Sequence, residues 1–159
     1  MVKLTKSELP EGLVINKDRD YREGEIFQIL LKDCLRKCYI CEIKPIPPEV
    51  EHRLTHKHDK ALKHDWNNIF YSCRYCNKVK NDRKYYSGIL DPTKLDPEEY
   101  IDLHMDYTEL SERVVIVNKI KDDGLVDITM DLLDTIFNNE STDINLSFAL
   151  ISTINSTMP

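Results

Sequence analysis

The chain of 159 residues is poor in glycine and, above all, in long apolar segments. It contains no run of 18 or more apolar residues, so the sequence predicts no membrane span. Its first residues, MVKLTKSELPEGL, lack the apolar core that a secretory signal needs. We therefore expect a cytoplasmic chain, folded as one compact domain or as a small domain with an appendage.

A positive net charge is also missing, because 22 basic residues stand against 28 acidic ones and the formal charge is −6. Taken alone, this balance argues against a nucleic-acid partner. The distribution reverses that impression. Residues 1–90 hold 18 lysines and arginines against 13 acids, whereas residues 91–159 hold 4 against 15. A phosphate backbone would meet the basic part, so the two parts are expected to serve different purposes.

Hydrophobic periodicity and turn residues predict a mixture of helices and strands. Helices are expected over residues 25–36, 74–86, 96–105, 127–138 and 143–155. Strands are expected over residues 49–54, 66–72 and 113–118, and irregular structure over residues 1–22 and 55–65. The elements and the charge together divide the chain into an N-terminal segment and helix, a central unit, and an acidic, mostly helical region, at residues 1–37, 38–88 and 89–159.

Cysteines are few, but four of the five form two C-x2-C pairs, Cys38/Cys41 and Cys73/Cys76. Thiols stay reduced in a cytoplasm, so these pairs are interpreted as metal ligands. Two such pairs can enclose one Zn²⁺, and a set of four sulfurs is typical of a closed, structural site. The 31 residues between the pairs exceed the spacing of a simple zinc ribbon, so an insert with its own role is expected. The fifth cysteine, Cys34, falls on an apolar helix face and is expected to be a buried core thiol, with a redox or ligand role as the alternative.

The insert contains the pair Glu51-His52 and then the segment Trp66–Ile69, and Asn77 directly follows the last cysteine. The order C-x2-C, (D/E)-H, W-x-N-(I/L), C-x2-C-N-x2-K resembles the HNH (His-Me finger) nucleases that carry a zinc knuckle. This resemblance implies an α+β fold with a ββα-metal HNH core, stapled by the Zn(Cys)4 knuckle and flanked by helices at both ends. It also implies an endonuclease that hydrolyses phosphodiester bonds, with DNA expected ahead of RNA, through one metal ion and a histidine base.

The resemblance implies a role for each polar residue of the motif. His52 would be the general base, because a neutral imidazole can accept a proton near pH 7. Glu51 and Asn77 would hold a catalytic Mg²⁺ or Mn²⁺, since hard cations prefer oxygen ligands. Asn68 would fix the loop and orient the His52 ring through hydrogen bonds. Two of these roles have neighbouring alternatives, Asn67 for Asn68 and Asn81 for Asn77.

Adjacent residues on a strand point to opposite faces, so Glu51 and His52 can reach one site only through a local twist or bend. Basic residues near the insert are predicted to contact nucleic acid: Arg53, Lys78, Lys80, Arg83 and Lys84. The histidines of the charged loop are expected to be solvated or to contact phosphates, with extra metal ligation as the alternative: His56, His58 and His64. Trp66 is expected in the hairpin core, with base stacking as the alternative.

A looser resemblance extends further, through the segment 89–106 and the early SELPEGL. Both are similar to the HNH subunits of Septu-type and retron-associated anti-phage systems. That resemblance implies a prokaryotic cytoplasm, a role in antiviral defence, and an ABC/SMC-like ATPase partner that would dock on or regulate the acidic region 89–159. The competing interpretation is a non-catalytic zinc-knuckle module that binds nucleic acid or protein.

Overall fold

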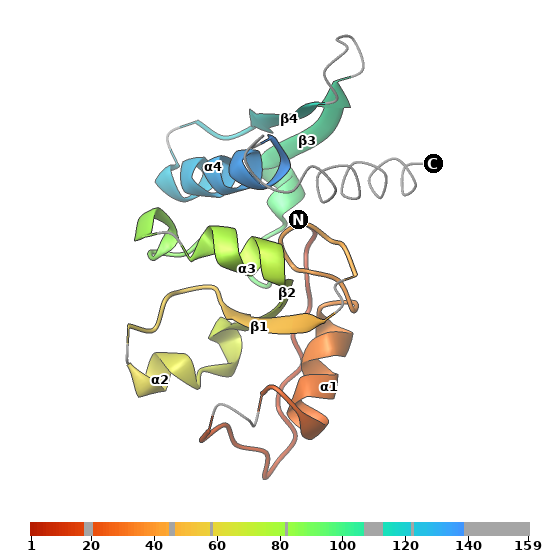
Figure 1. Ribbon diagram of the computed structural model, residues 1–159, viewed down its shortest axis with the longest axis vertical. Coiled ribbons are helices and arrows are strands. Elements are labelled where there is room, and N and C mark those ends of the chain that lie inside the picture. The colour runs from red at the N-terminus through yellow and green to blue at the C-terminus, as the bar shows by residue number, and fades with distance from the viewer. Residues whose placement is uncertain are drawn as a thin grey trace.

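The computed structural model describes residues 1–17, 21–44, 47–57, 59–81, 83–106, 113–121 and 123–138. In chain order, the helices and strands are α1 (Gly24–Asp33), β1 (Pro48–His52), α2 (Lys60–Lys63), β2 (Ile69–Cys73), α3 (Arg74–Lys80), β3 (Ile101–Asp106), β4 (Arg113–Asn118) and α4 (Gly124–Asn138) (Figure 1). Short 3-10 turns lie at Trp66–Asn68, Arg83–Tyr85 and Pro97–Glu99. The fold is therefore a small α+β fold, as predicted.

The centre of the molecule is an antiparallel hairpin followed at once by a helix. β1 pairs with β2 in a register that joins Pro48 to Cys73 and His52 to Ile69. α3 begins at the residue after β2 and packs on both strands, while α1 contacts β2 (Figure 1). This order places the end of β1 and the body of α3 next to each other.

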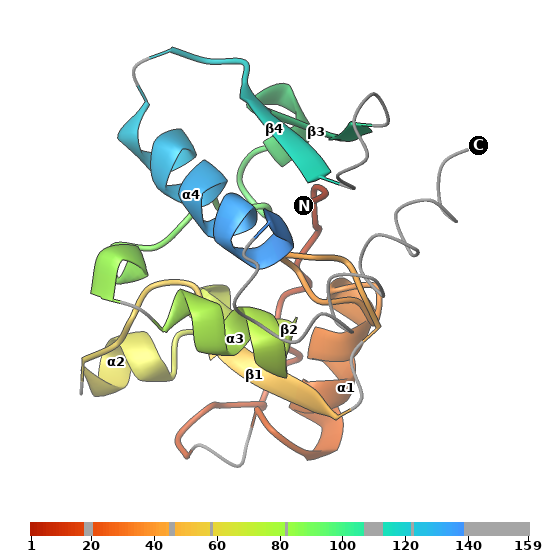
Figure 2. The same cartoon turned by 45° about the horizontal axis from the view of Figure 1, so that its top comes forward.

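A second antiparallel hairpin, formed by β3 and β4, lies beyond α4 (Figure 2). α4 packs against both β4 and α3, so it separates this hairpin from the first one. The Tyr85 hydroxyl donates to Asp131 on α4 at 2.7 Å, and the Tyr75 hydroxyl of α3 donates to the carbonyl of Ile136 at 3.2 Å. These contacts tie α4 to the central unit.

The buried side chains of both units form one hydrophobic core. Leu30, Ile40, Ile69, Leu90 and Leu132 are all excluded from solvent, and they come from segments far apart in the sequence. The core therefore contains residues from all three segments that the sequence suggested, 1–37, 38–88 and 89–159. Among the described residues, no helix has the length and apolar content needed to cross a membrane.

The first predicted helix ends earlier than its periodicity suggested. α1 stops at Asp33, and the N–H of Arg36 donates to the carbonyl of Leu31 at 2.7 Å. Leu35 and Arg36 take left-handed conformations, with φ of 55° and 58°. Left-handed residues together with such a backward hydrogen bond end a helix and change the direction of the chain. Here the chain turns towards the first cysteine pair.

The helix predicted over residues 96–105 is wrong. Asp96 caps a single 3-10 turn, with the Glu98 N–H donating to its carboxylate at 3.1 Å, and the chain then enters β3. Ile101, Leu103 and Met105 alternate with polar residues, which is the two-residue period of a strand. Pairing with β4, a non-local contact, outweighed the local helix signal.

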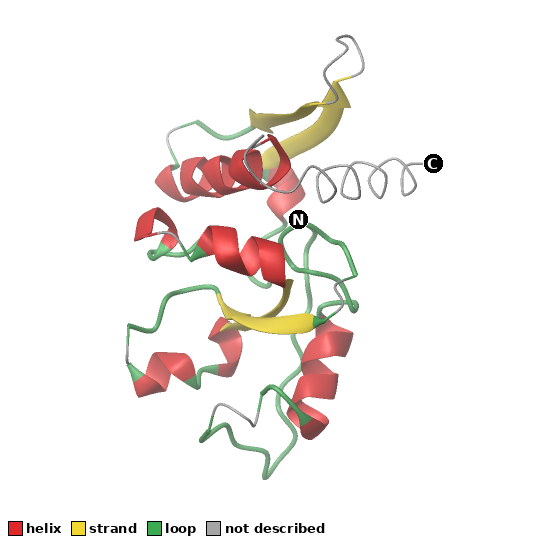
Figure 3. Ribbon diagram, in the orientation of Figure 1, coloured by secondary structure: helices red, strands yellow, loops and turns green. Residues whose placement is uncertain are grey.

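The remaining predictions differ mainly at their ends. The predicted strand 113–118 is β4, and the predicted helix 127–138 is α4, which begins at Gly124 because Asp123 accepts from the N–H of Leu125 at 2.9 Å. The predicted helix 74–86 stops at Lys80, and the predicted loop 55–65 contains the short α2. The described part of residues 1–22 has no helix or strand, as predicted (Figure 3). The helix predicted over 143–155, and His58, lie outside the described residues.

Candidate functional site

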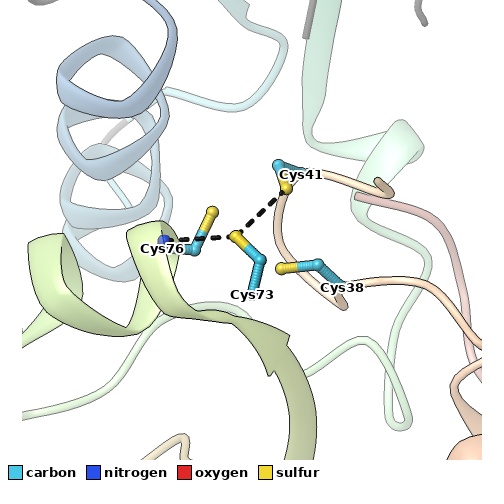
Figure 4. A group of neighbouring side chains, drawn as sticks. All are labelled: Cys38, Cys41, Cys73 and Cys76. Atoms are coloured by element: carbon cyan, nitrogen blue, oxygen red, sulfur yellow. Dashed lines mark hydrogen bonds between the residues drawn. The ribbon is translucent and has the colours of Figure 1, made fainter. Parts of the chain in front are cut away.

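Four cysteines lie together where the junction of β2 and α3 meets the turn at residues 38–41, which precedes β1. The sulfur atoms of Cys38, Cys41, Cys73 and Cys76 all lie within 4.8 Å of one another (Figure 4). The Sγ atoms of Cys41 and Cys73 are 3.8 Å apart, which is about the 3.8 Å edge of a tetrahedron built on Zn–S bonds of about 2.3 Å. The four sulfurs could therefore hold a zinc ion, as the spacing predicted.

Each pair is presented by a tight local structure. In the first pair, the N–H of Cys38 donates to the carbonyl of Ile43 and the N–H of Glu42 donates to the carbonyl of Cys38, both at 2.8 Å. In the second pair, Cys73 ends β2 and the N–H of Cys76, in the first turn of α3, donates to its Sγ at 3.3 Å. The strand-to-helix junction is thus also one side of the metal site.

The closeness of the four sulfurs, and not their titration, marks this group as the candidate metal site. Hydrogen bonds with the Cys38 and Cys41 thiols hold the pKa of Cys73 well below its ordinary value, whereas the pKa values of Cys41 and Cys76 are raised, by hydrogen bonding with Cys38 and by burial respectively. Cys34 lies outside the group among the described residues, and burial raises its pKa to about 11. Its predicted place as a buried core thiol is confirmed.

A cavity of about 370 Å³ opens beside the hairpin and α3. It brings together six residues that the sequence singled out: Glu51, His52, His56, Asn77, Lys80 and Asn81. Because β1 ends at His52, the chain bends there, and both Glu51 and His52 line the cavity although they are adjacent. The requirement for a bend at this pair is therefore met.

The ring of His52 has a fixed orientation. Its Nε2 lies 2.9 Å from the carbonyl oxygen of Lys63, and since a carbonyl only accepts, Nε2 carries the proton and Nδ1 carries the lone pair. The Tyr21 ring packs edge-on against it at 5.7 Å between centroids, and the His56 ring lies at 5.0 Å. Burial lowers the pKa of His52 to about 4, so the imidazole is neutral at pH 7.

Asn68 fixes the loop that follows β1. It is buried, its Nδ2 donates to the carbonyls of Leu54 at 2.9 Å and Leu62 at 3.1 Å, and its Oδ1 accepts from the N–H of Leu54 at 2.7 Å. Leu62 precedes Lys63, whose carbonyl binds His52. Asn68 thus acts on His52 through the loop, whereas the alternative, Asn67, is exposed.

Asn68→Ala is expected to lower the free energy of unfolding by about 1–3 kcal/mol, because partly buried backbone groups of Leu54 and Leu62 lose their partner. Urea denaturation of the zinc-loaded protein measures this. Asn67→Ala is the matched control and should change it by no more than about 0.5 kcal/mol. Equal effects of the two substitutions would contradict the role given to Asn68.

Glu51 already has partners in the protein. Its Oε1 lies 2.5 Å from the Nζ of Lys80, Oε2 accepts from the Tyr39 hydroxyl, and Lys80 also donates to the carbonyl of His52 at 2.9 Å. Burial raises the pKa of the Glu51 carboxyl. Asn77 donates through Nδ2 to a carboxylate oxygen of Glu49 at 2.7 Å. A cation held by Glu51 would share that carboxylate with Lys80.

Lys80→Met is expected to cost about 3–5 kcal/mol of stability, because it leaves the buried Glu51 carboxylate without its positively charged partner. The double variant Glu51→Gln/Lys80→Met should recover part of this loss. Lys78→Met, on the exposed side of the same helix, is the control. All three are compared by urea denaturation, and a Lys80→Met protein as stable as the control would show that the ion pair is not stabilising.

The predicted nucleic-acid contacts differ in how accessible their charges are. Arg53 lies 3.4 Å from Asp91 and donates to the carbonyl of Ile89, and Lys80 is buried, so both are engaged within the protein. Lys84 is exposed but pairs with Asp131 at 2.7 Å. Lys78 and Arg83 are exposed.

The structure also shows residues that sequence reasoning missed. Tyr21, Arg22 and Lys63 line the cavity with His52, and two of them precede α1 in a segment whose sequence has no pattern to mark them. Trp66 packs against the core, donates to the carbonyl of Ser7 at 2.8 Å, and is covered by the Lys6 ammonium at 4.2 Å, which agrees with its predicted place in the hairpin core.

No protein-family model, curated protein or solved structure matches the chain. The function proposed for it therefore rests on its own residues and their geometry.

Proposed function

We propose that the chain is a metal-dependent HNH-type endonuclease, in which a zinc knuckle braces a ββα core around a histidine base. The observation that carries the proposal is one cavity that gathers His52, Glu51 and Asn77, with the His52 ring fixed so that Nδ1 is its basic nitrogen. A module that only binds needs no oriented neutral histidine beside oxygen donors, so this arrangement favours catalysis.

In this proposal His52 accepts the proton of the attacking water at Nδ1, and the imidazolium shares its Nε2 proton with the carbonyl of Lys63. Glu51 and the amide oxygen of Asn77 are the donors that fit a hard cation. Bound there, Mg²⁺ or Mn²⁺ would neutralise charge on the phosphate and the departing oxygen. Asn68 keeps the Lys63 carbonyl in place, and the loop that it fixes limits the motion of the base.

The zinc in this proposal is structural, because all four of its ligands are sulfurs from the protein. Exposed Lys78 and Arg83 would contact the strand, with DNA as the expected substrate. The looser resemblance adds an antiviral role in a prokaryotic cell and an ABC/SMC-like ATPase as the proposed partner. Co-purification of the chain with the products of neighbouring genes tests the partner separately from the chemistry.

The activity is tested by incubating supercoiled plasmid and single-stranded DNA or RNA with zinc-loaded protein, with and without Mg²⁺ or Mn²⁺. Cleavage by the wild type that requires the added cation and His52 supports the proposal. Tight binding without cleavage, in the presence of the partner as well, would support the non-catalytic module instead.

A further inference from the structure

The cavity beside His52 has a positive formal charge. Its lining contains Arg22, Lys63 and Lys80 but only one acid, Glu51, which forms an ion pair with Lys80. A cavity with a positive lining concentrates anions, and in a nuclease the anion is a phosphate of the substrate.

Arg22 is placed to use this charge. Its side chain is exposed, and it forms no ion pair with any residue that the structure describes. Its guanidinium carbon lies 5.9 Å from the centroid of the Tyr21 ring, which is buried and packs edge-on against His52. Tyr21 thus holds the backbone of Arg22 close to His52, while the Arg22 guanidinium stays accessible to solvent.

We infer that Arg22 is a substrate-binding residue that holds a phosphate of the nucleic-acid strand in the His52 cavity. The guanidinium matches two phosphate oxygens at once, a geometry that a lysine ammonium cannot reproduce. Tyr21 and Arg22, just before α1, are then part of the nuclease site. This inference rests on the proposed function, because it takes the ligand of the cavity to be a nucleic-acid phosphate.

The test compares Arg22→Ala, Arg22→Lys and the control Lys32→Ala, which removes one positive charge from an exposed position on α1 outside the cavity. Cleavage of a labelled single-stranded oligonucleotide is followed over a range of concentrations. Arg22→Ala is expected to raise KM at least 10-fold with a smaller change in kcat, Arg22→Lys to lie between it and the wild type, and Lys32→Ala to match the wild type.

A second measurement does not need cleavage. The same oligonucleotide is titrated with His52→Ala protein, with and without Arg22→Ala, at several salt concentrations. Loss of one phosphate contact is expected to reduce the slope of log Kd against log salt by about 0.7. The Lys32→Ala change in the same background should leave the slope as it was.

The outcomes separate the two proposals. If the wild type cuts while Arg22→Ala has an unchanged KM and salt slope, the role of Arg22 is overturned and the nuclease stands. If no protein cuts any substrate, with the ATPase partner present as well, the nuclease proposal fails, and the titration alone decides whether Arg22 binds phosphate. A lower salt slope would then support Arg22, and an unchanged slope would overturn it.

Discussion

Removal of zinc is expected to unfold the central unit, and with it the cooperative fold of the chain. Chelation, or the substitution Cys76→Ser, leaves buried thiols in place of a bound metal at the junction of β2 and α3. Structural zinc contributes on the order of 10 kcal/mol in small metal-dependent folds, which is comparable to the whole stability of a domain. Circular dichroism during a thermal scan should therefore show no cooperative transition in the metal-free protein.

The control for this experiment is the fifth cysteine. Cys34→Ala also changes a buried thiol, but Cys34 lies outside the group of four sulfurs. It should retain one zinc per chain by elemental analysis and lose about 1 kcal/mol of stability. A metal-free wild type with the same transition as the zinc-loaded protein would show that the four cysteines do not hold the fold.

The group of four cysteines was predictable because its signal is local and chemical. Two C-x2-C pairs place thiolates within single tight turns, whatever connects them, and the structure brings all four sulfurs together. The order of hairpin and helix that follows from the motif is also present. The strand at residues 101–106 was missed although its two-residue alternation is local, because the capped start at Asp96-Pro97 favoured a helix and the pairing with β4 that decides between the two is not visible in the sequence.

The cavity too contains some residues that the sequence predicted and others that it did not. Glu51, His52 and Asn77 were singled out by motif, and the structure places them along one surface. The ion pair between Glu51 and Lys80 could not be foreseen, because a lysine after C-x2-C-N predicts an exposed helix face unless the packing of α3 on β1 is known. Arg22 was missed for the same reason: only the packing of Tyr21 against His52 brings it to the site.

His52→Ala is expected to lower kcat by about 10²–10⁴-fold, the usual contribution of a positioned general base. The fold should survive, because the ring is only partly buried and its hydrogen bond to the described residues is to a carbonyl. Zinc content and the thermal transition, measured on the same preparation, separate lost chemistry from lost structure. Nicking of supercoiled plasmid under single-turnover conditions gives the rate.

Two comparisons make this prediction specific to the base. His104→Ala removes an exposed histidine paired with Asp102 on the second hairpin, so its cleavage rate should match the wild type. Imidazole added to His52→Ala should restore part of the rate, because the free base can enter the space left beside the cavity and accept the same proton. If His52→Ala cuts as fast as His104→Ala, His52 is not the base, and the fixed orientation of its ring would then serve only to pack the loop that Asn68 holds.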